Sequence, residues 1–266
     1  MSAGHAPEIP NFISIVAEAL PENHFWQTLL RYENIVFVTI SVIFITAVVY
    51  FGTREKQLIP RRLQNFLELL YTGLMGFFEE LFGSKARAVK YFPFLSGLFI
   101  FILCNNYMGL IPFFKSTNSA YTSTLPLALI VFVYVQYTAV TELGFFKYML
   151  HLAGDPQELV QYIMAPILFV LHIIGEIARP VTLSLRLFGN IMAEDTLLGV
   201  FGGFGVAAVV FIVGLFGPTL SSSFVGLPVH LPFYLLSMVG GLVQAFVFTL
   251  LAAIYLSLVL PHEEGH

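Results

Sequence analysis

Long apolar runs alternate with short polar segments along most of the chain, and they predict its membrane-spanning helices. Ile35 to Phe51 predicts a first span, because a helix needs roughly 17–25 mostly apolar residues to cross the hydrocarbon core. Phe92 to Phe114 and Leu125 to Phe146 predict the second and third spans. Between the first two, the mixed apolar and acidic residues of 63–82 are typical of a helix that lies on the membrane surface.

Two later apolar stretches are too long to stand upright as single spans. Residues 163–217 contain no obvious aqueous loop, and as one helix they would extend ~80 Å against a ~30 Å hydrocarbon core. They either break into two spans near the glycines at 199, 202, 203 and 205 or form one steeply tilted helix. Residues 231–260 would extend ~45 Å, which favours tilt for both. We therefore expect an all-α integral membrane protein with about five transmembrane helices plus an interfacial helix, the last two spans forming a strongly tilted hairpin.

The basic residues predict the orientation of these spans. Residues 1–34 form an N-terminal segment without Lys or Arg before Arg31, so they lack the basic start of a signal or transit peptide. Within this segment, Ile9 to Leu20 form either a short interfacial helix or a loose tail. We interpret residues 35–266 as a single membrane domain. The positive-inside rule places the N-terminus outside and the C-terminus in the cytoplasm. Eight of the 12 Lys and Arg residues then lie inside: Arg54, Lys56, Arg61, Arg62, Lys85, Arg87, Lys90 and Lys147.

The composition agrees with a membrane location and argues against several function classes. Hydrophobic residues make up 58% of the chain and charged residues 11%, whereas soluble domains are about 25% charged. A net charge of -4 leaves no basic surface for nucleic acid. Cys104 is the only cysteine, so we expect no intramolecular disulfide and no thiolate metal cluster. Only His172 lies within a long apolar segment, and haem held between helices usually needs paired ligands. We expect no metal and no cofactor.

Polar residues of the long apolar region share one helix face. At ~100° per residue, they fall within a stripe roughly 80° wide that also contains Leu183. We call these residues the polar track: His172, Glu176, Arg179, Arg186, Asn190 and Glu194. Arg186 requires an explanation, because a guanidinium stays charged and is costly in hydrocarbon. The alternative is a structural pair of Glu176 with Arg179 at i, i+3 and a surface Arg186.

Asn105 and Asn106 interrupt the second predicted span. They either form hydrogen bonds between helices or line an aqueous path.

Three segments, in this order, resemble subunit a of F-type ATP synthases, the stationary membrane subunit beside the rotating ring of c subunits. They are NNYMGLIPF at 105–113, RPVTLSLRLFGNIMAE at 179–194 and LVQAFVFTLLAAIYLSL at 242–258. The resemblance implies a non-catalytic, ion-translocating subunit without cofactors in a bacterial inner membrane. It implies the c-ring, the peripheral-stalk b subunits, membrane lipid and, indirectly, the F1 head as partners, and no nucleic acid.

By this resemblance, Arg186 faces the carboxylate of the c-ring between two offset half-channels. The other implied positions are Asn190 beside it, Gln244 facing it from the last helix, Tyr255 near the inner end, Asp195 as the relay acid, and Glu176 and Glu194 as further outer-path candidates. The sequence departs from the family at Glu194, where Gly is common, and at Ser237, where some members have His. His172 is the candidate for the missing imidazole. Arg179, Asn105 and Asn106 are interpreted as structural polar residues.

Two other classes of protein also place charges inside a membrane. A secondary antiporter is disfavoured because the chain shows no internal repeat, no paired broken helices and no carboxylate pair near the middle of a span. A quinone-site subunit of a redox complex is disfavoured by the lack of haem ligands.

Overall fold

The computed structural model describes residues 12–20, 24–54, 62–111, 114–119, 121–154, 159–216 and 231–260. These residues contain helices and no strands, and five of the helices are long and apolar enough to cross a membrane. The five are α3 (Glu33–Thr53), α5 (Lys85–Met108), α6 (Tyr121–Leu143), α8 (Leu159–Phe216) and α9 (Leu231–Val259). The shorter helices are α1 (Phe12–Ala19), α2 (His24–Arg31), α4 (Arg62–Phe82), η1 (Thr117–Ser119) and α7 (Phe145–Leu152). The expected all-α integral membrane fold is confirmed.

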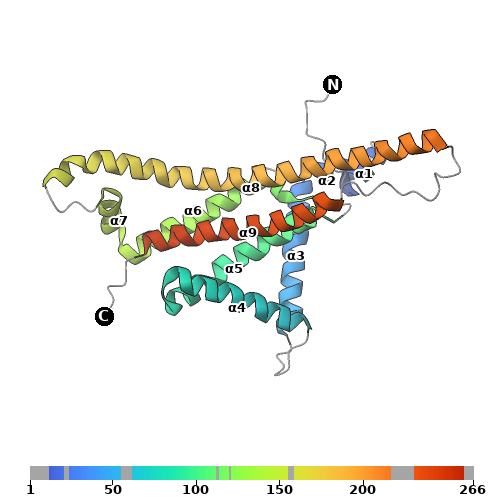
Figure 1. Ribbon diagram of the computed structural model, residues 1–266. Helices are drawn as coiled ribbons and strands as arrows, with labels where there is room; N and C mark the ends of the chain where they lie inside the picture. The colour runs from blue at the N-terminus through green and yellow to red at the C-terminus, as the bar shows by residue number, and fades with distance from the viewer. Residues whose placement is uncertain are drawn as a thin grey trace. The chain divides into compact units, whose positions relative to one another are not determined.

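Helix α8 is one uninterrupted helix of 58 residues (Figure 1). Its length of ~87 Å is almost three times a ~30 Å hydrocarbon core, so it cannot lie upright within the membrane. The glycines at 199, 202, 203 and 205 lie inside the helix, and the alternative of a break there is wrong. Residues 217–230, between the two helices predicted to form the tilted hairpin, lie outside the described residues.

Several helix boundaries differ from the predicted spans. Helix α5 begins at Lys85, seven residues before Phe92, because residues 85–90 favour a helix although they are too polar for the membrane core. It ends at Met108, and the chain then turns back so closely that a Cβ at Gly109 would lie 2.6 Å from the Ser116 Cβ. Helix α6 ends before Gly144, whose φ of 79° is a left-handed conformation that favours glycine at a helix end.

The chain packs as two compact units, each assembled from separate stretches of sequence. The first unit contains residues 1–47, 101–120 and 188–245, and the second contains residues 48–100, 121–187 and 246–266.

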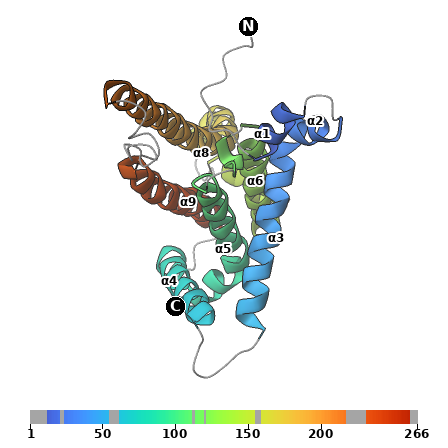
Figure 2. The same cartoon turned by 90° about the vertical axis from the view of Figure 1, so that its right-hand side faces the viewer.

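In the first unit, α1 and α2 form a short pair beside the start of α3 (Figure 2). Their apolar core is made of Ile13, Phe37 and Met108, with Leu29, Leu30 and Val36 packed against it. The loop after α5 is tied to the start of α3 by an ion pair of 2.7 Å between Lys115 Nζ and Glu33 Oε1.

In the same unit, the second part of α8 packs against the first part of α9. The rings of Phe201 and Phe233 stack with centroids 3.8 Å apart, and Glu194 lies against Gly240. Phe201 contacts Phe233 and Glu194 contacts Gly240, so residue numbers decrease along α8 while they increase along α9. The two helices are therefore antiparallel in this unit.

In the second unit, α4 is amphipathic and buries Leu74, Met75, Phe78 and Phe82. The rings of Tyr71 and Phe78 both pack against the ring of Phe92 on α5, with centroid distances of 4.7 and 6.2 Å, respectively. Phe66 and Leu69 remain 57% and 70% exposed on the other side, as a helix at a lipid surface allows.

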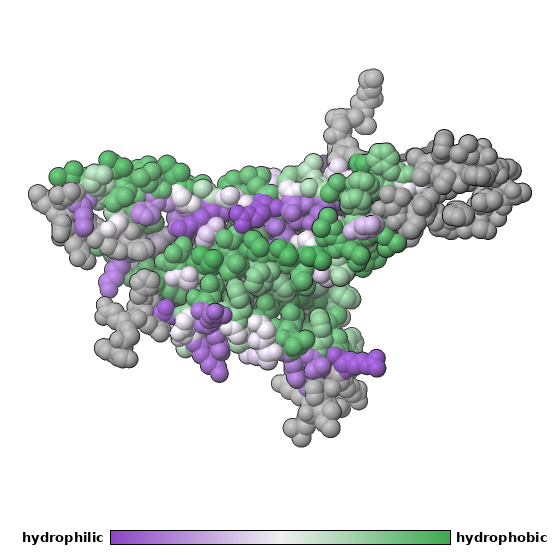
Figure 3. All heavy atoms as spheres, in the orientation of Figure 1, coloured by the Kyte–Doolittle hydropathy of each residue, from purple (hydrophilic) through white to green (hydrophobic). Residues whose placement is uncertain are grey.

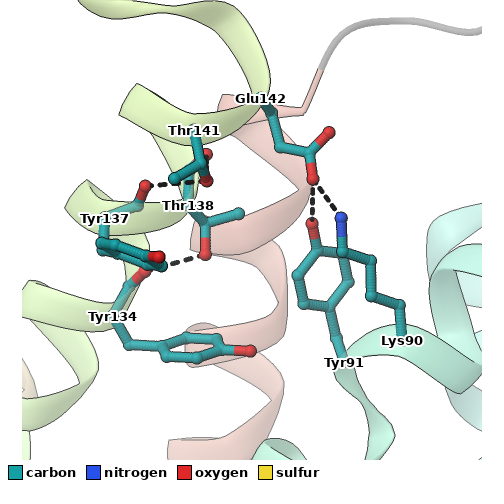
Figure 4. Close-up of polar contacts among 7 residues, drawn as sticks. All are labelled: Lys90, Tyr91, Tyr134, Tyr137, Thr138, Thr141 and Glu142. Carbon is teal, nitrogen blue, oxygen red and sulfur yellow. Dashed lines mark hydrogen bonds and ion pairs between the residues drawn. The ribbon is translucent and has the colours of Figure 1, made fainter.

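Helices α5 and α6 are joined at a polar contact in the second unit. Lys90 forms an ion pair with Glu142, and the Tyr91 hydroxyl lies 3.3 Å from the same Glu142 oxygen (Figure 4). Thr138 and Thr141 instead donate to carbonyls of their own helix. The positive charge of Lys90 and the negative charge of Glu142 therefore neutralise each other at this end of the two helices.

Candidate functional site

Hydrophilic side chains follow α8 in a row bordered by hydrophobic surface (Figure 3). The residues of the polar track are divided between the two units, with His172 to Arg186 in the second unit and Asn190 and Glu194 in the first.

In the second unit, the polar track forms a connected cluster around Glu176. Arg179, one turn further along α8, forms an ion pair with this carboxylate. Gln136 of α6 donates from Nε2 to Glu176 Oε2 over 2.8 Å, and the Tyr148 hydroxyl of α7 donates to Gln136 Oε1. The Arg179 guanidinium lies 5.1 Å from the centre of the Tyr255 ring of α9, a cation–π distance. The negative charge of Glu176 is thus both neutralised and hydrogen-bonded within this cluster.

The phenol of Tyr148 is a neutral donor in this cluster. Burial, followed by the negative charge of Glu176, raises its pKa. The hydroxyl therefore stays protonated at physiological pH and donates a hydrogen bond to Gln136 Oε1.

Arg186 differs from Arg179 in its surroundings. Leu183, Ser184 and Leu187 are buried, whereas the Arg186 side chain is exposed. Among the described residues of its unit it forms no hydrogen bond and no ion pair, although Arg179 only two turns away has both. Arg186 therefore lies on α8 beside buried residues, with its own side chain exposed.

In the first unit, the polar track meets α9 at Gly240, and α5 meets α9 at the next residue, Gly241. Asn190 donates from Nδ2 to Glu194 Oε1 over 2.7 Å, and this half-buried carboxylate lies against Gly240. Asn106 of α5 donates to the carbonyl of Gly241 over 2.9 Å. Three helices, α5, α8 and α9, thus contribute to one polar region.

The two asparagines at the end of α5 organise the loop that follows them. Asn118 donates to Asn106 Oδ1 and Thr117 donates to Asn105 Oδ1, both over 2.7 Å. All four side chains are buried. These bonds favour the prediction that the asparagines make structural hydrogen bonds, because both amides are occupied by protein partners.

Gln244 of α9 is buried at 7% exposure, and its Nε2 makes no hydrogen bond among the described residues. A buried donor without a partner costs about 1–3 kcal/mol, so this amide destabilises the fold unless it meets a partner outside the described residues. Ser237, on the same helix, is also buried.

His172, Asp195 and Tyr255 are the remaining predicted site residues, and Tyr255 belongs to the Glu176 cluster through its contact with Arg179. His172 is exposed, and its Nδ1 lies 3.0 Å from the Leu168 carbonyl of its own helix. Asp195 and Tyr255 are half-buried. Sequence reasoning did not select Gln136, Tyr148 or Gly240. Gln136 had a signal, an amide inside an apolar span, whereas Tyr148 and Gly240 become significant only through their contacts.

The helices and the polar track define a class of protein, a helical membrane protein with several spans and with charged side chains along one of them. The chain belongs to the ATP synthase A chain family, whose family model matches residues 35–257.

Several ATP synthase subunit a proteins are similar to this chain over most of its length. The protein of Protochlamydia amoebophila is 38% identical over 259 residues, which are 97% of this chain and 91% of the relative. That of Cereibacter sphaeroides is 36% identical over 226 residues, 83% of this chain and 77% of the relative. That of Campylobacter jejuni is 34% identical over 232 residues, 86% of this chain and 92% of the relative. The resemblance seen in the sequence is confirmed, and the chain is an integral membrane component of a multi-subunit ATP synthase.

Proposed function

We propose that this chain is the stationary, ion-translocating subunit of the ATP synthase membrane sector. In this role it catalyses no covalent reaction. It provides two offset half-channels and presents Arg186 to the carboxylates of a rotating c-ring, so that ion flow drives rotation and ATP synthesis. The protein sits in a bacterial inner membrane, with its N-terminus outside and its C-terminus in the cytoplasm. Peripheral-stalk b subunits hold it, and the F1 head is coupled to it indirectly.

The observation that supports this proposal is the contrast between the two arginines of α8. Arg179 is neutralised by Glu176, whereas Arg186 is exposed and has no partner among the described residues of its unit. A guanidinium in a membrane span is stable only beside an acid or water. At ~4 Å and an effective dielectric constant of ~20, attraction to a carboxylate is about 4 kcal/mol. This is strong enough to favour the ionised acid and weak enough to release it.

The orientation of the spans suggests which cluster serves which face. Helix α8 runs outward, so Asn190 and Glu194 lie on the outer side of Arg186, and we assign Glu194 and Asp195 to the outer half-channel. Glu176 was an outer-path candidate by sequence. Because it lies on the inner side of Arg186 and is paired with Arg179, we propose that Glu176 is structural and not part of the outer path.

Cysteine crosslinking tests whether a ring of separate subunits lies beside this face of α8. In a Cys104→Ser background, Asn190→Cys should form a disulfide with a cysteine placed near the c-ring carboxylate. Ser184→Cys is the matched control on the same helix, because Ser184 is fully buried and should not react. Equal crosslinking at 184 and 190, or none at 190 in assembled complexes, would contradict the proposed interface.

Gln244→Leu should lower coupled ATP synthesis about fivefold, because this amide would no longer make a hydrogen bond of about 1 kcal/mol to the passing c-ring. Leucine has a similar volume and removes the unpartnered buried amide, so the thermal stability of the complex should stay unchanged or rise. Ser41→Ala is the control, since Ser41 is also buried with an unpartnered hydroxyl but lies in α3. Synthesis and melting temperature would be measured together. Lower stability with unchanged synthesis per complex would show that Gln244 is structural.

A further inference from the structure

Gly240 of α9 lies against the carboxylate of Glu194 on α8. A Cβ at position 240 would be 2.4 Å from Glu194 Oε1 and 3.2 Å from its Cδ. Carbon and oxygen atoms that are not bonded do not approach so closely. The carboxylate therefore occupies the space that a side chain at position 240 would fill.

The same carboxylate is held from its own helix. Asn190 donates to Glu194 Oε1, the oxygen that points at Gly240. On α9, the next residue is Gly241, where a Cβ would lie 3.2 Å from the Asn106 Cβ of α5. The two glycines thus allow α9 to approach α8 with one residue and α5 with the next. The contacts at Gly241 are with Asn106 and the Tyr107 ring, whereas the contact at Gly240 is with a carboxylate.

We propose that Gly240 is a positioning residue for ion transfer through Glu194. By having no side chain, it sets how close the carboxylate lies to α9. Gln244 follows four residues later on the same face of that helix, so the position of the carboxylate also sets its distance from the buried amide. This inference rests on the proposed function, in which Glu194 carries ions in the outer half-channel.

An alanine at position 240 separates a positional effect from a folding effect. The Glu194 oxygen must withdraw by about 1 Å to move from 2.4 Å to the 3.4 Å of an ordinary contact. The clashing atom is the end of a flexible side chain, so the helices need not separate. Alanine is also the better helix former. The complex should therefore assemble normally with a displaced carboxylate.

The test uses the complete ATP synthase in liposomes, with passive proton conduction through the membrane sector as the readout. Gly240→Ala should lower conduction roughly 10- to 100-fold, the range that a ~1 Å misplacement of a reacting group produces. Glu194→Asp shortens the side chain by one methylene and should also slow conduction. The combination of the two should conduct faster than Gly240→Ala alone, because the shorter acid fits beside the new methyl group. Gly97→Ala in α5, where nothing lies within 4 Å, is the control and should conduct normally.

Glu194→Gln distinguishes this inference from the proposed function. If Glu194→Gln is defective while Gly240→Ala conducts normally, the positioning role is wrong and the outer path stands. If Glu194→Gln conducts normally, Glu194 is not in the path, and both statements about it are wrong. A double variant no faster than Gly240→Ala would likewise overturn the positioning role, since a general structural defect is not rescued by a shorter acid.

Discussion

Arg186→Ala should abolish ATP synthesis driven by an ion gradient, the largest effect that we expect from a substitution in this chain. The Arg186 guanidinium is exposed on α8 and has no partner among the described residues of its unit. If it attracts a passing c-ring carboxylate with about 4 kcal/mol, its loss lowers the population of the ionised acid about 1000-fold. The rotor would then have no preferred deprotonated state between the two half-channels.

The measurement is ATP synthesis by vesicles under an imposed proton gradient, compared with ATP hydrolysis by the catalytic head after its release. Synthesis should be lost and hydrolysis retained. Arg186→Lys keeps the charge but loses the planar fork of donors, so synthesis should be impaired less than in the alanine variant. Equal defects in both variants would assign the role to guanidinium geometry rather than to charge. Normal synthesis with alanine would exclude Arg186 from the transfer step.

The apolar pattern of the sequence predicts the spans well because the membrane restricts the possible structures. Each unsatisfied backbone group in hydrocarbon costs several kcal/mol, so apolar runs of sufficient length become helices. The same cost explains why α8 continues through its glycines. A glycine destabilises a helix by about 1 kcal/mol, which is less than the cost of a break without water. The start of α5 was less predictable, because Lys85 to Lys90 form a helix without being apolar.

The candidate site was predictable only as a helix face. Periodicity places Glu176, Arg179 and Arg186 on one stripe of α8, since helix geometry follows from residue spacing alone. The i, i+3 spacing also allows the pair of Glu176 with Arg179, but it does not indicate the contacts that Gln136 from α6 and Tyr255 from α9 make with this pair. Nor does it single out Gly240, whose importance lies in the Glu194 carboxylate next to it. The surroundings of Arg179 and the role of Gly240 are set by contacts between helices, which residue spacing does not show.

Arg179→Gln should destabilise the complex by about 2–3 kcal/mol, because it removes the positive charge beside Glu176. The side chains of Arg179 and Glu176 are 27% and 13% exposed, so water reduces this cost below that of a fully buried pair. Removing both charges in Glu176→Gln with Arg179→Gln should recover most of the stability, since two amides leave no uncompensated ion. The melting temperature of the purified complex measures each variant.

Coupled synthesis in the same three variants determines the role of the pair. We expect synthesis per assembled complex to fall with stability in Arg179→Gln and to recover in the double variant. Such recovery would make the pair a structural tie between α6, α8 and α9, because a charge required for transfer is not replaced by an amide. Stable double-variant complexes without synthesis would instead place Glu176 in the ion path. The two arginines of α8 would then both act in transport, and the contrast that supports our proposal would be lost.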